Sequence, residues 1–211
     1  MRQHTRALSL FVSLLCAACV TSGGRRTSTR ASVGPWLEPS PHLRMQIEDQ
    51  VERLPWTSGV ERIELIQWFA TVGEPAYPTL LELATDERSH VAGAALAALG
   101  ATGDSRLVEP MRSLAWPDAA HDSLRLERAR ALLRLGDWSM VPILIDGLEA
   151  EHLMVRALCG QALYESTRER FGFEPGADEA ARAAAVGRWR TWWDARRNDP
   201  LIGGGEAPSG S

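Results

Sequence analysis

The chain has 211 residues, of which 45% are hydrophobic and 24% charged, enough for one domain or two small ones with a sizeable buried core. Its formal net charge of −4 offers no overall attraction to nucleic acid or to anionic membranes. All 23 basic residues are arginine, which together with abundant alanine is typical of a GC-rich bacterial genome. The three cysteines and five histidines do not show the spacing of a zinc site, so no metal or cofactor is predicted.

The first 18 residues have the composition of a signal peptide. Arg2 and Arg6 give a positive start, and residues 7–18 form a run of apolar and small residues. This run of about a dozen residues is too short to cross a bilayer, which needs roughly 20. We therefore predict a signal peptide over residues 1–18 rather than a transmembrane anchor.

The motif Ala17-Ala18-Cys19 resembles a bacterial lipoprotein signal, in which a cysteine after two small residues receives the lipid. Cys16 departs from that pattern, which usually has leucine there. The resemblance implies lipidation of Cys19 and a stable anchor in the cell envelope, since such proteins carry several acyl chains. Val20 is not the aspartate that retains lipoproteins at the inner membrane, which favours the outer membrane or the periplasmic face. Ordinary secretion into the periplasm, with Cys19 as a free thiol, is the alternative.

Two segments have the composition of flexible chain. Residues 19–40 hold the lipid-attachment cysteine and a tether rich in Gly, Ser, Thr, Pro and Arg, with Trp36 as its largest apolar residue. Residues 200–211 read as a disordered tail.

A repeat of about 30 residues occupies the region between them. Aligned on the residue that closes each first helix, the units are spaced 30, 33 and 31 residues apart, at Gly73, Gly103, Gly136 and Thr167. A large apolar residue stands four positions before each anchor: Phe69, Leu99, Leu132 and Leu163. Alanines one position earlier, at 98, 131 and 162, predict close approach of two helices. Asp104 and Asp137 are placed to cap the second helix of their units. The apolar intervals are helical, so each unit is predicted to be a helix, a turn and a second helix.

These units resemble short HEAT-like repeats, in particular the variety found in phycobilisome lyases. The matching residues are the apolar-Arg openings Leu124-Arg125 and Val155-Arg156, and the Gly-Asp closings at 103–104 and 136–137. The first unit departs with Gly73-Glu74, and the second has Ala92 in place of arginine. The resemblance implies an all-α fold: a short right-handed α-solenoid of about four stacked helix–turn–helix repeats over residues 41–199, with N- and C-terminal capping helices. It says little about function.

Both ends of the array show capping signals. Ser40-Pro41 is typical of a helix start, and Ser58 with Glu61 predicts a capping box for the next helix. Trp189, Trp192 and Trp193 share one face of the last helix, which predicts that they close the core rather than hold a ligand.

No catalytic constellation is apparent in the sequence. There is no phosphate-binding glycine loop, nucleophile elbow or carboxylate–histidine metal spacing, so no catalytic residue is predicted. Cys159 lies within an apolar helix and is predicted to be a small core residue. Four arginines with Glu127 are predicted to form a solvated face: Arg125, Arg128, Arg130 and Arg134.

The remaining candidate surface is the inner, concave face made by the second helices, the usual binding face of such arrays. Its predicted binding residues are Glu82, Arg112, Trp116, Trp138, Asp146 and Glu149. For Trp138, packing against its own turn is the alternative.

The sequence thus favours an envelope-anchored scaffold or adaptor that binds a protein partner through the concave face. One alternative is a lyase-like or hydrolytic enzyme on the same scaffold, as the bilin-lyase resemblance would allow. Nucleic-acid binding is disfavoured by export and by the negative charge.

Overall fold

The computed structural model describes residues 36–115 and 122–199. Backbone contacts divide the chain into Met1–Gly34 and Pro35–Ser211, and every described residue belongs to the second unit. The predicted signal peptide, Cys19, most of the tether, Trp116 and the tail lie outside the described residues.

Within the described residues the structure is all-helical, as predicted, with no strand. The longer helices are α1 (Pro41–Arg53), α2 (Gly59–Val72), α4 (Ser89–Ala101), α6 (Asp122–Arg134), α8 (Leu153–Thr167) and α9 (Glu179–Arg196). The short ones are α3 (Tyr77–Leu83), α5 (Val108–Arg112) and α7 (Val141–Gly147). No described helix is long and apolar enough to cross a membrane.

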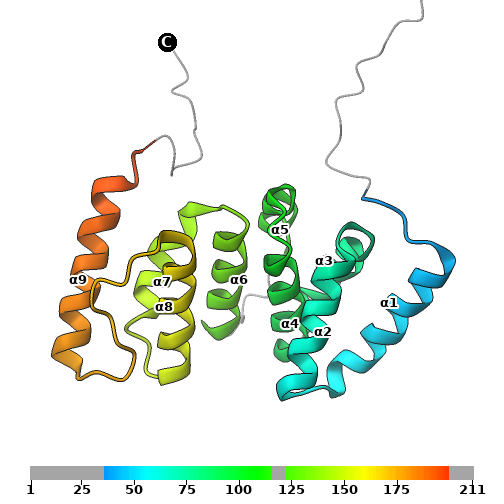
Figure 1. The fold of residues 1–211 in the computed structure, drawn as a ribbon, viewed down its shortest axis with the longest axis horizontal. Coiled ribbons are helices and arrows are strands. Elements are labelled where there is room, and N and C mark those ends of the chain that lie inside the picture. The colour runs from blue at the N-terminus through cyan, green and yellow to red at the C-terminus, as the bar shows by residue number, and fades with distance from the viewer. Residues whose placement is uncertain (1–35, 116–121, 200–211) are drawn as a thin grey trace, which may run out of the picture. The chain divides into compact units, whose positions relative to one another are not determined.

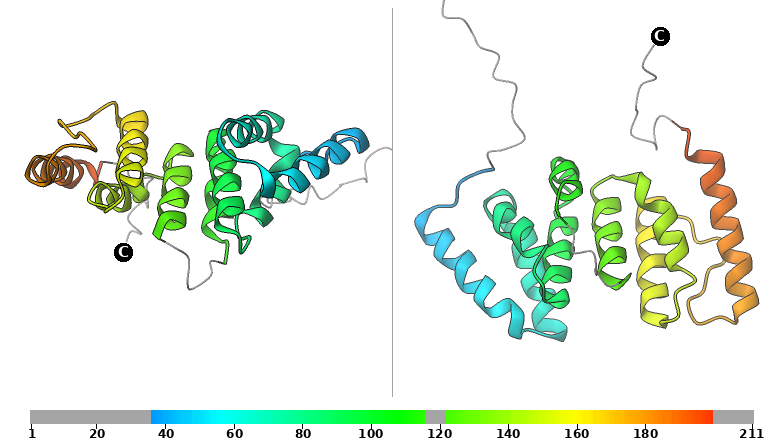
Figure 2. Two further views of the ribbon diagram at one scale, coloured as in Figure 1. Left: turned by 90° about the horizontal axis from the view of Figure 1, so that it is seen from below. Right: turned by 180° about the vertical axis from the view of Figure 1, so that it is seen from behind.

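The first helices of successive units pack against one another. Helix α2 contacts α4, α4 contacts α6, and α6 contacts α8 (Figure 1). The short second helices lie beside them: α3 contacts α4, and α7 contacts α6, α8 and α9, as the two further views also show (Figure 2).

Each short second helix is introduced by one turn of 3₁₀ helix. These turns are η2 (Glu74–Ala76), η3 (Ser105–Leu107) and η4 (Trp138–Met140), while η1 (Leu54–Trp56) follows α1. Asp104 and Asp137, predicted to cap the second helices, cap the 3₁₀ turns that lead into them: Asp104 accepts from the backbone N–H of Arg106 at 3.0 Å, and Asp137 from that of Ser139 at 3.2 Å. These bonds satisfy backbone donors that a helix start leaves free.

The glycines that close the first helices adopt a left-handed backbone conformation. Gly73, Gly103 and Gly136 all have positive φ, which a residue without a Cβ adopts at little cost. The fourth anchor differs, because Thr167 is still helical and Arg168 takes the left-handed position instead, with φ 63°.

The two predicted N-terminal caps have different outcomes. Ser40 accepts from the backbone N–H of Leu43 at 3.2 Å, so that cap is confirmed. The capping box of Ser58 and Glu61 is wrong: Ser58 makes no side-chain cap bond, and the Glu61 carboxylate accepts from Arg53 at 3.0 Å instead.

Two apolar clusters form the core, and α6 contributes to both. Leu124, Ala131, Leu132 and Leu135 join the cluster that contains α1 to α5, whereas Leu126, Ala129 and Leu133 join the cluster of α7, α8 and α9. All four large residues before the anchors are buried, with exposed fractions of 1% or less: Phe69, Leu99, Leu132 and Leu163. Trp36 extends the first cluster by packing edge-on against Tyr77, with ring centroids 4.9 Å apart.

Helices α4 and α6 approach each other closely at Gly100. A Cβ added to Gly100 would lie 2.7 Å from the Cα of Ala131 and 3.0 Å from its Cβ, so only glycine fits without movement. The alanines predicted at close approach, Ala98, Ala131 and Ala162, are at most 2% exposed, and for Ala131 the contact with Gly100 confirms the close approach.

We expect Gly100→Ala to lower the free energy of unfolding by about 1–3 kcal/mol, because the added methyl must push the two helices apart. Gly93 in the same helix is the matched control, since a Cβ there meets nothing within 4 Å. Gly93→Ala should raise the free energy of unfolding by about 0.5–1 kcal/mol through helix propensity. Urea unfolding followed by circular dichroism measures both, and equal effects of the two variants would contradict the close contact.

Candidate functional site

The predicted binding residues that the structure describes are mostly paired within the molecule. Arg112 donates to Asp137 through Nε at 2.8 Å and through a terminal nitrogen at 2.7 Å, and to the Ser139 hydroxyl at 3.3 Å. The Asp137 side chain is only 2% exposed. This two-pronged ion pair ties α5 to the turn before α7, so Arg112 has a structural role.

Trp138 and Glu82 lie in different surroundings. Trp138 is half-buried and packs against the second cluster, so part of its ring is used within the molecule. Glu82 is exposed on α3 and lines a shallow hollow with Asp86 and Arg88.

Asp146 and Glu149 are brought together by a residue that the sequence analysis did not assign to this face. Arg190 of α9 donates to Glu149 at 2.6 Å and to Asp146 at 3.2 Å. Next to this cluster is a hollow of ≈280 Å³, which we call the α7–α9 hollow. It is lined by Pro142, Ile145, Asp146, Arg190, Trp193, Asp194 and Arg197.

Of the four arginines predicted to form a solvated face, Arg125 is exposed, whereas Arg128 and Arg134 are partly buried. For Arg130 the prediction is wrong. Arg130 is 9% exposed and pairs with Glu127, one turn away. Burial raises the pKa of Glu127, and the nearby Arg130 and Arg134 only partly oppose this. Arg134 donates to Glu165 of α8 at 2.8 Å, and Arg128 donates to the backbone carbonyl of Met111 at 3.0 Å. These arginines join helices, which the helical period alone did not indicate.

Cys159 is buried as predicted, at 1% exposed, and burial raises the pKa of its thiol to about 11. Its environment is that of a packed core thiol. Among the described residues, no group of three His, Cys, Asp or Glu side chains is placed to hold a metal ion.

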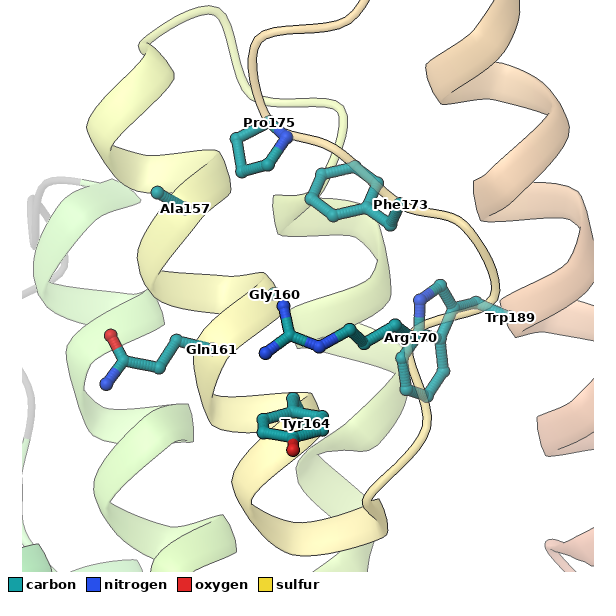
Figure 3. Close-up of a pocket in the computed structure, with 8 residues that line it drawn as sticks. All are labelled: Ala157, Gly160, Gln161, Tyr164, Arg170, Phe173, Pro175 and Trp189. Carbon is teal, nitrogen blue, oxygen red and sulfur yellow. The ribbon is translucent and has the colours of Figure 1, made fainter.

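A second cavity, which we call the C-terminal pocket, lies between α8, the loop 168–178 and α9, and has a volume of ≈140 Å³ (Figure 3). Its lining residues are Ala157, Gly160, Gln161 and Tyr164 from α8, Arg170, Phe173 and Pro175 from the loop, and Trp189 from α9. The sequence analysis assigned this segment to core closure alone and missed the pocket.

Arginines of the flanking helices hold the loop in shape. Arg156 donates to the carbonyl oxygen of Pro175 at 2.9 Å, and Arg188 to that of Phe171 at 2.8 Å. Phe171 has φ 49°, which is unfavourable for a bulky residue, and its ring packs edge-on against Trp189 at 4.8 Å. Strained backbone of this kind persists only where its surroundings over-determine it. The pocket wall is therefore preformed.

Two polar groups of the C-terminal pocket have hydrogen-bond donors without a partner in the part of the chain that the structure describes. The guanidinium of Arg170 lies 4.0 Å from the centroid of the Tyr164 ring and has no carboxylate partner among the described residues. Trp189 is 1% exposed, and its buried Nε1–H has no acceptor. A buried donor without an acceptor costs about 1–3 kcal/mol.

The comparisons with known proteins do not add a family: no protein-family model matches the sequence, and no curated protein is significantly similar to it. Over residues 36–115 and 122–199 the geometry defines an all-helical fold, with the α7–α9 hollow and the C-terminal pocket beside α9.

Substitution of Arg112 tests its structural role. We expect Arg112→Ala to lower the free energy of unfolding by about 2 kcal/mol at pH 7, because the buried Asp137 carboxylate loses its charged donor. Burial would raise the pKa of Asp137, but the hydrogen bonds from Arg112 and Ser139 outweigh it and leave that pKa below the usual 3.8.

The contribution of the pair should therefore be complete above about pH 4 and fade as the pH falls through the depressed pKa of Asp137. Urea unfolding of the wild type and the variant at pH 7, 5 and 3.5 measures the difference. Arg53→Ala, which breaks the exposed pair with Glu61, is the control and should cost less than about 1 kcal/mol. A constant difference down to pH 3.5 would contradict the role of the Asp137 carboxylate.

Proposed function

We propose that this chain is a lipid-anchored adaptor of the bacterial cell envelope whose helices form a short HEAT-like solenoid and bind a protein partner. Support for the solenoid comes from the sequential packing of α2, α4, α6 and α8 and from the 30–33-residue period. Support for the anchor comes from the lipoprotein-like motif that ends at Cys19.

The observation that carries partner binding is the α7–α9 hollow. It lies beside α7, one of the second helices, whose exposed face was predicted to bind. Half-buried Trp193 and exposed Pro142 provide apolar contact area there, and Arg190 and Arg197 line the hollow with polar donors. Tryptophan and arginine are the residues most often found at the energetic centre of protein interfaces. Arg190, already fixed by Asp146 and Glu149, would lose little side-chain freedom on binding.

The lipid anchor is tested with the paired cysteines. When the full chain is produced in a bacterium with a lipoprotein pathway, we expect it to incorporate labelled palmitate and to partition into the detergent phase. Cys19→Ala should lose both properties, whereas Cys16→Ala should retain them, because only Cys19 follows two alanines. Equal labelling of the two variants, or an unlabelled wild type, would contradict the anchor.

Partner binding is tested by site-specific photocrosslinking in the producing cells. A photoreactive amino acid at Asp194, in the α7–α9 hollow, is expected to give one dominant protein adduct in the envelope fraction. Ala195 is the matched control, since 100° per residue places it on the far side of α9 from Arg190 and Arg197, and it is also exposed. The same adducts from both positions, or none from Asp194, would contradict a partner in this hollow.

A further inference from the structure

The C-terminal pocket has features that core closure does not explain. A helix cap that only buries apolar surface needs no cation at its edge and no unused donor inside it. Here both are present: the cation is Arg170, on a loop that Arg156 and Arg188 hold in place, and the unused donor is the indole N–H of Trp189 on α9. A ligand that satisfies both must carry a negative charge and a hydrogen-bond acceptor.

The charge available to a ligand comes from Arg170. Its exposed guanidinium rests on the ring of Tyr164 (Figure 3), where a cation–π contact fixes its position without using its five N–H donors. The carboxylate of Glu165, which follows Tyr164 in the chain, is paired with Arg134 and also accepts from the Gln161 amide, both at 2.8 Å. A carboxylate is the natural partner for an unused guanidinium fork.

The second group that needs a partner is the indole N–H of Trp189, which requires a hydrogen-bond acceptor. Figure 3 shows its indole nitrogen on the side of the ring that faces α8, across the pocket. Apart from the Gln161 amide and the Tyr164 hydroxyl, the rest of the lining is apolar. Phe173 lies over Gly160, where an added Cβ would come within 3.1 Å of the ring, and Pro175 forms the upper wall. A cavity of about 150 Å³ holds a molecule the size of benzene, so ≈140 Å³ suits a small apolar body.

We propose that the C-terminal pocket binds an organic carboxylate with a short apolar body. The carboxylate pairs with Arg170, one of its oxygens or an adjacent carbonyl accepts the Trp189 Nε1–H, and the apolar body lies against Phe173 and Pro175. A phosphate dianion would find a single guanidinium and apolar walls, which is a poorer match. The carboxylate is either that of a free acid or the C-terminus of a peptide. This inference is independent of the α7–α9 hollow and of the adaptor proposal.

The test uses the full chain in detergent and follows the Trp189 indole N–H signal by NMR, assigned as the signal lost in Trp189→Phe. The probe is N-acetyl-L-leucine, and N-acetyl-L-leucinamide, which lacks the carboxylate, is the control ligand. We expect saturable binding of the acid with a downfield shift of the Trp189 signal, and at least tenfold weaker binding of the amide. This comparison needs no variant, so it stands even if a substitution disturbs the loop.

Two variants then test whether Arg170 is the cation that binds the carboxylate. Arg170→Gln should weaken binding of the acid at least tenfold, whereas Arg168→Gln, at an exposed arginine of the same loop, should leave it unchanged. Equal binding of acid and amide, unchanged binding in Arg170→Gln, or no shift of the Trp189 signal with N-acetyl-L-leucine, isovalerate and benzoate would each overturn the proposal. A tetrapeptide ending in leucine separates the sources: tighter binding than the acid supports a peptide C-terminus, and no binding supports a free acid.

Discussion

The close approach of α4 and α6 is the constraint on which the rest of the structure depends. It is possible only because Gly100 has no side chain where the backbone of Ala131 passes. With α6 packed this closely against α4, one face of α6 contributes side chains to the cluster of α1 to α5, and the other face contributes to the cluster of α7 to α9. A wider spacing would leave unfilled volume on both sides of α6, since well-packed interiors hold few voids larger than a water molecule.

Arginine side chains make most of the ion pairs and side-chain hydrogen bonds around these clusters, and their partners lie mostly within the molecule. Arg112 and Arg134 each join one unit to the next through a carboxylate, at Asp137 and Glu165. Arg156 and Arg188 donate to loop carbonyls instead. The planar guanidinium suits both tasks, because it presents several donors in fixed directions. Against this background, a guanidinium such as that of Arg170, which is held by an aromatic ring alone, stands out as available to a ligand.

These internal arginine pairs explain why the sequence predicted the exposure of some candidate binding residues but not their partners. The repeat period placed Asp146 and Glu149 correctly on exposed positions, because exposure follows from the helical pattern. It could not show that Arg190, more than 40 residues away, pairs with both. Nor could it show that Arg112 is paired with a buried carboxylate, since that depends on the distance between two units. The C-terminal pocket was missed for a related reason: its walls come from a helix, a loop and a second helix that only the folded chain brings together.

The sequence by itself determined the helical character, the positions of the buried apolar residues, the glycine turns and the aspartate caps. These features depend on local geometry: 3.6 residues per turn, positive φ at the closing glycines, and a side-chain oxygen within reach of a nearby N–H. Only the tertiary structure decided which arginines pair within the molecule, that Ser58 does not cap α2 while Glu61 pairs with Arg53, and that Arg170 and the Trp189 indole meet at one pocket. Most of those outcomes depend on contacts between segments distant in the chain, where side chains of equal polarity compete for the same partners.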